Sequence, residues 1–358
     1  MQIELKFRID SEDVSAFRRH PLLTRHTSSR ARSYQRTGIY FDTPDFQLKR
    51  HHVTLQVARV GKQWRQTLTA VRHEGGNPHS RRKWGVDVAG PNLDLWAIMQ
   101  LFAHDPEFKH DRFDASLTSS LVPVFTLTSR RSIWHLDFGQ GQEAELTMDN
   151  GEAHSGDART PIGYLTLVHR CGAIDAFFEF ALALVDDFNL RLAYLNQSDV
   201  GYGLHDCYSF GAVTAKQVVL GHDIKIEEGM RTIVRNCLSQ IAGNAAGVSI
   251  GEDAECIHQM RVGLRRLRSA IEIFETMVPC PEQIQTDINR LSAELGAARD
   301  WEVLGDVTLP SMTEYALDIV GLETLRKKVQ LETARKHRKA SVALDSTRST
   351  RLWLMLNR

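Results

Sequence analysis

Cysteine is scarce and scattered in this chain. Its five cysteines among 358 residues include no CxxC pair, so the sequence indicates neither a zinc site nor a disulfide framework. No apolar run reaches the length of a membrane span, and the first residues lack the apolar stretch of a signal peptide. We therefore expect a cytoplasmic protein with reduced thiols and no membrane partner.

An excess of charge of either sign is also lacking. The 44 lysines and arginines are balanced by 44 aspartates and glutamates. A protein that coats nucleic acid through bulk positive charge is therefore not indicated. A P-loop is missing as well, because Gly61-Lys62 follows no glycine-rich turn, and no GxSxG motif occurs. Any basic site in this chain must be a local concentration of charge.

The hydrophobic period divides the chain in two. Up to about residue 203, alternating runs such as QIELKFRI, VTLQVARV and PVFTLTSRRSIWHL are separated by Gly, Pro, Asn and Asp, which is typical of antiparallel strands. Beyond about residue 221 the period is helical. We predict an α+β domain over residues 1–205 whose strands form an antiparallel β-barrel, a linker over 206–222 and an all-α helical bundle over 223–358.

The segment Ile257–Phe274 predicts an amphipathic helix with one basic face. At about 100° per residue, its basic side chains fall within a narrow arc opposite the apolar ones: His258, Arg261, Arg265 and Arg268. Arginine keeps its charge and offers a fork of donors that fits phosphate oxygens, so such a row suits a repeating polyanion. The alternative is an ordinary solvated face, although no acidic residue lies among these four.

This helix reads HQMRVGLRRLRSAIEIF, and a later stretch over residues 295–304 reads LGAARDWEVL. The two motifs, in this order, resemble the hallmarks of the CHAD domain. The resemblance implies a helical bundle, with polyphosphate granules as one compatible location. It also implies that inorganic polyphosphate is bound by basic side chains: His258, Arg261, Arg265, Arg268 and Arg299.

CHAD domains comprise two related halves, and this chain resembles the first. Two explanations are open: the sequence is a truncation of a longer CHAD domain, or a homodimer completes the bundle. Its contact face would be the apolar residues Trp353, Leu354 and Leu356, which the sequence predicts to be exposed.

The strand-rich part resembles the CYTH, or triphosphate-tunnel, family. The clearest marker is YFDTP at residues 40–44, and WRQTL, RRKW, RRSIW and GYGL follow in the family's order. The resemblance implies a tunnel in which carboxylates hold Mg²⁺ or Mn²⁺ and basic residues clamp a triphosphate. The activity it implies is that of an inorganic triphosphatase, which hydrolyses tripolyphosphate to diphosphate and phosphate.

Several charged positions of that family are neutral here. The first glutamate of ExExK is Gln2, and the strand that reads LRVR in the family is LQVA, residues 55–58. Other expected tunnel positions also lack charge: Thr69, Gly85, Thr126, Thr128, 163–168, Asn196 and Gln197.

The charged roles that the resemblance implies are left to few residues. Glu4 and Lys6 would be the residual catalytic residues. The triphosphate would contact Lys6, Arg82 and Arg130. A metal ion would be held by Glu4, Glu145 and Asp149.

Two functions are compatible with these residues. The first is binding of inorganic polyphosphate or tripolyphosphate by the basic helix, with a tunnel that is weak or inactive in catalysis. The alternative is an active inorganic triphosphatase with Mg²⁺ or Mn²⁺ as cofactor. A third, binding of RNA or DNA by the same helix, is not favoured because few aromatic side chains near it could stack on bases.

Overall fold

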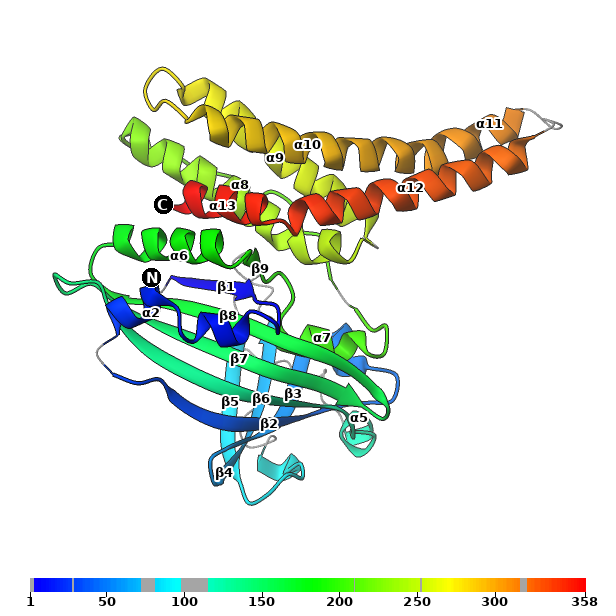
Figure 1. The fold of residues 1–358 in the computed structure, drawn as a ribbon. Coiled ribbons are helices and arrows are strands. Elements are labelled where there is room, and N and C mark those ends of the chain that lie inside the picture. The colour runs from blue at the N-terminus through cyan, green and yellow to red at the C-terminus, as the bar shows by residue number, and fades with distance from the viewer. Residues whose placement is uncertain are drawn as a thin grey trace. The chain divides into compact units, whose positions relative to one another are not determined.

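The computed structural model describes residues 3–27, 29–71, 81–97, 115–208, 210–251, 253–315 and 321–358. The chain divides into two compact units, Met1–Ser209 and Phe210–Arg358, drawn in Figure 1. The boundary falls inside the predicted linker. Each unit is described by itself.

Unit 1 is built on one antiparallel sheet, ordered β5-β4-β3-β2-β6-β7-β8-β1-β9. Its strands are β1 (Glu4–Arg8), β2 (Arg32–Asp42), β3 (Val53–Val60), β4 (Gln63–Val71), β5 (Arg81–Val88), β6 (Val122–Asp137), β7 (Glu143–Ser155), β8 (Ala158–Cys171) and β9 (Arg191–Leu192). The predicted antiparallel α+β class is confirmed. Within the described residues, no ladder joins the end strands β5 and β9.

Helices pack on both faces of this sheet. They are α1 (Val14–Phe17), α2 (Pro21–His26), α3 (Gln47–Arg50), α5 (Ala115–Ser119), α6 (Asp175–Asp187) and α7 (Gln197–Gly203). Phe17 of α1 meets Trp134 of β6 edge to face, and Phe177 of α6 meets His169 of β8 in the same way. Burial of these apolar faces supplies the main driving force for folding of the unit. The opposite face bears polar side chains, but α7 packs on part of it, where Gln197 donates to Asp149 and Tyr202 meets Phe125 edge to face.

The YFDTP marker ties β2 to helices α3 and α7. Asp42 is fully buried, and its carboxylate accepts hydrogen bonds from the Leu48 and Lys49 N–H groups and from the Tyr202 hydroxyl, at 2.8, 3.0 and 3.0 Å. Burial raises the pKa of Asp42, although these donors oppose the shift. Lys49 Nζ lies 2.6 Å from Asp199 Oδ1 of α7. Asp42 of the YFDTP marker therefore joins strand β2 to helices α3 and α7.

Unit 2 is the predicted all-α bundle. Its helices are α8 (Ile226–Ile250), α9 (Ala254–Phe274), α10 (Glu282–Val303), a π-helical stretch (Leu304–Thr308), α11 (Leu309–Tyr315), α12 (Leu322–Leu344) and α13 (Thr347–Asn357). The Asp253 side chain caps α9 by accepting from Cys256 N at 3.0 Å. In the described ranges, no helix is both long enough and apolar enough to cross a membrane.

Part of the predicted linker packs on α8. Asn244 is fully buried, and its side chain accepts from Val213 N at 3.0 Å and donates to Val213 O at 2.8 Å. Asn236, two turns earlier in α8, donates to Lys216 O at 3.2 Å. The segment from Val213 to Lys216 therefore runs along α8 and belongs to the helical unit.

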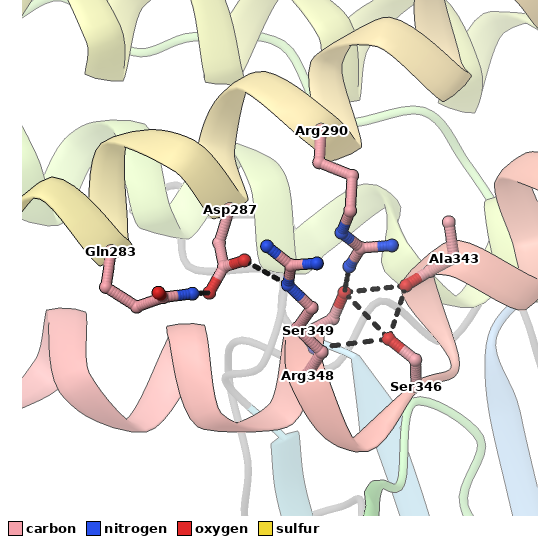
Figure 2. A network of polar contacts seen from close by, with 7 residues as sticks. All are labelled: Gln283, Asp287, Arg290, Ala343, Ser346, Arg348 and Ser349. Atoms are coloured by element: carbon pink, nitrogen blue, oxygen red, sulfur yellow. Dashed lines mark hydrogen bonds and ion pairs between the residues drawn. The ribbon is translucent and has the colours of Figure 1, made fainter.

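The expected dimer face around α13 is not exposed. Trp353 and Leu354 are 7% and 1% exposed, and Leu356 is half-buried. Figure 2 shows why: α13 folds back on α10, where Arg348 pairs with the buried Asp287 and Arg290 donates to Ser349 Oγ at 3.2 Å. The prediction of an exposed contact face was wrong, because this network turns the apolar side of α13 inward.

Candidate anion-binding surfaces

Helix α9 separates basic and apolar side chains as its sequence predicts. Met260, Leu264 and Leu267 are completely buried. The α9 basic surface, defined as His258, Arg261, Arg265 and Arg268, lies opposite: its three arginines are exposed and His258 is half-buried. No hydrogen-bond acceptor or carboxylate pairs with these four side chains among the described residues.

Arg266 differs from its neighbours. It points to α8, where its guanidinium donates to Gln240 Oε1 at 2.9 Å and to Asn236 Oδ1 at 2.7 Å. The helical period therefore distinguishes one structural arginine from three that are available to a ligand.

Arg299 of α10 lies beside this surface. Arg261 reaches over α10, since a Cβ placed at Gly296 would lie 3.9 Å from Arg261 Nε. The short connection over residues 275–281 makes α9 and α10 antiparallel, so His258, one turn before Arg261, is level with Arg299, one turn after Gly296. Arg299 also pairs with the buried Glu302 at 2.9 Å, which fixes its position but offsets part of its charge.

The sheet of unit 1 has an inner face, defined as the face that bears Asp149, Arg131 and Arg65. Cross-strand partners in a sheet lie on the same face, and the register pairs Asp149 with Arg131 and Tyr164, and Glu145 and Glu4 both with Val168. The same reasoning places these basic residues on it: Lys6, Arg8, Arg32, Arg36, Arg65, Lys83 and Arg131.

The carboxylates predicted to hold a metal ion lie on this face, but each is paired with a cation. Glu4 lies 3.0 Å from Lys6, and Glu145 lies 3.0 Å from Arg170. Asp149 accepts hydrogen bonds from Nε and Nη2 of Arg131 at 2.8 and 2.6 Å. Gln197, at the family's lysine position, adds a donor to Asp149 at 2.9 Å.

This donor set does not fit Mg²⁺ or Mn²⁺. Such ions need several oxygen ligands on one point, whereas no group of three or more His, Cys, Asp or Glu side chains converges among the described residues. The acids that the fold family would use are committed to arginine or lysine partners instead. No catalytic step through a metal ion follows from this arrangement.

The strand register corrects part of the predicted triphosphate site. Arg130 pairs with Asn150 and alternates with Arg131, so it lies on the face opposite Asp149. Thr126 and Thr128 share the outer face with Arg130. The prediction erred by one residue, and in a strand such a slip moves every side chain to the other face. Arg82 pairs with Ala70 in the ladder, but its side chain lies outside the described residues.

Other predicted replacements are on the inner face. Gln56 and Thr69 occupy inner positions of β3 and β4, where the family has basic residues. The inner positions of β8 are Tyr164, Thr166 and Val168, none of them acidic.

Of the basic residues of the inner face, the sequence reasoning predicted Lys6 alone. Those it missed include four cations from four strands: Arg36, Arg65, Lys83 and Arg131. Arg65 pairs with Asp87 at 3.0 Å, whereas Arg36 and Lys83 have no bonded partner among the described residues. One signal in the sequence could have found them. Neighbouring residues of a strand lie on opposite faces, so Lys83 lies on the face opposite Trp84.

Family models match both parts of the chain. Residues 1–158 match the CYTH domain and residues 232–358 match the CHAD domain. An uncharacterised protein of Mycobacterium tuberculosis is 24% identical over 387 aligned residues, which cover 98% of this chain and 68% of that protein.

Two further relatives match one part each. A Haemophilus influenzae protein named inorganic triphosphatase is 22% identical over 165 residues, covering 46% of this chain and 44% of that protein. The crystal structure of the CHAD domain from the plant Ricinus communis is 44% identical, covers 41% of this chain, and has a TM-score of 0.38. This chain spans 49% of that structure's length. The chain thus carries a CYTH domain followed by a CHAD domain, the two families that its motifs resemble.

Proposed function

We propose that this protein binds inorganic polyphosphate through the α9 basic surface. The observation that supports the proposal is that three exposed arginines follow one face of a rigid helix without an acidic partner among the described residues. Arg261, Arg265 and Arg268 follow one another at about 4.5 to 6 Å along the helix axis. A chain of phosphates can meet each guanidinium in turn, whereas one carboxylate can meet only one of them.

The fold prepares this surface before a ligand arrives. The apolar side of α9 is buried and Arg266 is bonded to α8, so the backbone that carries the three arginines is held in place. A rigid display reduces the conformational entropy that binding would otherwise cost. Arg299 adds a fifth basic side chain beside His258.

We further propose that the CYTH domain is weak or inactive in metal-dependent hydrolysis. Metal-assisted phosphoryl transfer needs carboxylates free to hold the ion and a positioned water. Here Glu4, Glu145 and Asp149 are paired with Lys6, Arg170 and Arg131. A divalent ion would have to displace these cations before any reaction.

Binding is tested with Arg261→Ala/Arg265→Ala and long-chain polyphosphate in calorimetry. The matched control is Lys327→Ala/Arg335→Ala, which removes two charges from exposed sites on α12 that are paired with Glu323 and Glu332. We expect the first variant to lose at least about tenfold in affinity and the control to bind like the parent. Equal binding by all three proteins would refute the α9 basic surface.

Catalysis is tested by phosphate release from tripolyphosphate with Mg²⁺ or Mn²⁺, beside a Glu4→Ala variant. We expect little or no release from the folded parent. Robust release that Glu4→Ala abolishes would instead establish the alternative function, an active inorganic triphosphatase.

A further inference from the structure

The start of α8 and the end of α9 lie side by side at one end of unit 2. Gly247 of α8 lies against Cys256 of α9, and Gly263 of α9 lies against Ile241 of α8, so the two helices are antiparallel. Because both helices have the same rise per residue, the last turn of α9 is level with the first turn of α8. This end of the unit is on the left in Figure 1, where α8 begins in green and α9 ends in yellow.

The segment before α8 reaches the same end. The Asn236 side chain of α8 donates to Lys216 O of this segment and accepts from Arg266 of α9, so both lie on one side of α8. Gly229 lies on that side two turns earlier, and a Cβ placed there would lie 3.9 Å from the Leu220 side chain. The segment therefore follows α8 as far as its first turn.

Five large apolar side chains at this end are exposed to solvent, at between 42% and 81%. We define them as the end patch: Val219, Leu220, Ile226, Ile273 and Met277. Ile273 follows Arg266 by two turns of α9, and so lies on the same side as Leu220, while Met277 is level with Ile226. Single exposed apolar residues need no explanation, but a group that gathers in one place indicates an interaction surface.

The end patch is bordered by negative charge. Four glutamates lie within two residues of a patch residue in the sequence: Glu227, Glu228, Glu272 and Glu275. All four are exposed, and none has a cationic partner among the described residues. Lys225 is the one lysine or arginine within the same sequence distance. Charge complementarity therefore favours a partner whose apolar residues are flanked by lysine or arginine, and disfavours an anionic membrane or a nucleic acid.

Helix α12 of this protein presents a face of that kind. Leu331 and Val342 are 72% and 62% exposed. At about 100° per residue they share one arc of the helix with three exposed cations: Lys327, Arg335 and Arg338. Lys327 and Arg335 each pair with one exposed or half-buried glutamate, whereas Arg338 has no acidic partner in the described part of the chain. We define these five residues as the α12 face.

We propose that the end patch of one copy of this protein docks on the α12 face of a second copy. Apolar side chains meet at the centre of the contact, and glutamates of one copy face lysine and arginine of the other at its border. A contact between two end patches would instead bring like charges together, as would a contact between two α12 faces. The surfaces are small, so the association is weak. Neither includes the α9 basic surface, and the proposal is independent of polyphosphate binding.

Sedimentation equilibrium of the full-length chain, without polyphosphate, tests this contact from about 1 μM to about 1 mM. We expect the average mass to rise above that of the monomer with concentration. Ile273→Ser and Leu331→Ser should each raise the dissociation constant at least about tenfold. Both side chains are mostly exposed, so the melting temperature should not change. The matched control is Val307→Ser, which alters a side chain that is 56% exposed and outside both surfaces, and it should associate like the parent.

Mixing the two variants identifies which surfaces meet. Ile273→Ser keeps an intact α12 face and Leu331→Ser keeps an intact end patch, so an equimolar mixture should associate more tightly than either variant alone. A parent that stays monomeric over the whole range would overturn the proposal. So would a mixture no tighter than its components, or a loss of association with Ile273→Ser that Leu331→Ser does not share, since the end patches would then meet each other.

Discussion

The α9 basic surface and the inner face of unit 1 both gather arginines, but they treat the charges differently. On α9 the arginines stand on the solvent side of one helix, and none has an acidic partner among the described residues. On the inner face, Arg65 and Arg131 are paired with Asp87 and Asp149, while Arg36 and Lys83 are not. The first arrangement favours an extended polyanion. The second favours a compact one, at the expense of the carboxylates a metal ion would need.

The largest expected effect destabilises unit 1, which carries the inner face, and leaves α9 intact. Lys49→Ala removes one partner of the buried Lys49–Asp199 pair, whose side chains are 8% exposed. The Asp199 carboxylate keeps its hydrogen bonds from Asn196 but loses its cation, and breaking such a buried pair should cost about 3–5 kcal/mol of unfolding free energy. Chemical denaturation followed by tryptophan fluorescence measures this loss, while polyphosphate binding by α9 should persist below the transition.

Lys327→Ala is the matched control for that measurement, because the Lys327–Glu323 pair is 72% and 71% exposed. An exposed pair contributes at most about 1 kcal/mol. If Lys49→Ala were as mild as Lys327→Ala, the marker residues of the CYTH domain would not have the structural role described above.

The affinity of the α9 basic surface for polyphosphate should depend on the salt concentration. Several guanidinium–phosphate contacts should make the affinity of α9 for long polyphosphate fall steeply with ionic strength. Arg261→Ala/Arg265→Ala should reduce the slope of log affinity against log salt by about 1 to 2. Titrations at four salt concentrations measure both slopes, and parallel slopes for parent and variant would contradict the contact model.

A smaller effect concerns helix α8, which packs against α9, rather than the charges on α9. Asn244→Ala leaves the backbone N–H and C=O of Val213 without the partners that hold this segment on α8. Burying such groups unpaired costs about 1–3 kcal/mol. Hydrogen exchange at Val213 and the denaturation midpoint should both report it, whereas Lys327→Ala, whose ion pair with Glu323 is exposed, should leave both nearly unchanged.

For helix α9, the sequence alone predicted which side chains share the basic face and which are buried. Its period is local, so residues 258, 261, 265 and 268 share a face once the segment is helical. The same rule placed Leu264 and Leu267 in the core, where the structure has them. Elsewhere in the helical unit, the exposure of Trp353 and Leu354 was mispredicted, because it depends on how α13 packs on α10.

The inner face could be predicted only in outline. The motifs indicated the fold and the neutral positions Gln56 and Thr69, but which of Arg130 and Arg131 points inward depends on a register set by β7. The convergence of Arg36 and Lys83 depends further on curvature across five strands. No local pattern carries that information, so the basic residues of this face were undercounted.

The smallest expected effect uses pH to separate the two surfaces. The pKa of Lys83 is lowered by partial loss of hydration and by Arg36, Arg65 and Arg131 on the neighbouring strands. As pH rises, Lys83 therefore loses its charge earlier than an ordinary lysine. The CYTH resemblance implies that basic residues of this face contact a triphosphate, so the affinity for tripolyphosphate should fall with that charge. Guanidinium groups stay charged throughout, so the arginines of the α9 basic surface keep theirs. Calorimetry between pH 7 and pH 10 should show a few-fold loss for tripolyphosphate and little change for long polyphosphate, and Lys83→Arg should remove the difference. A tripolyphosphate affinity that is equally flat in the parent would mean that Lys83 does not contact the ligand.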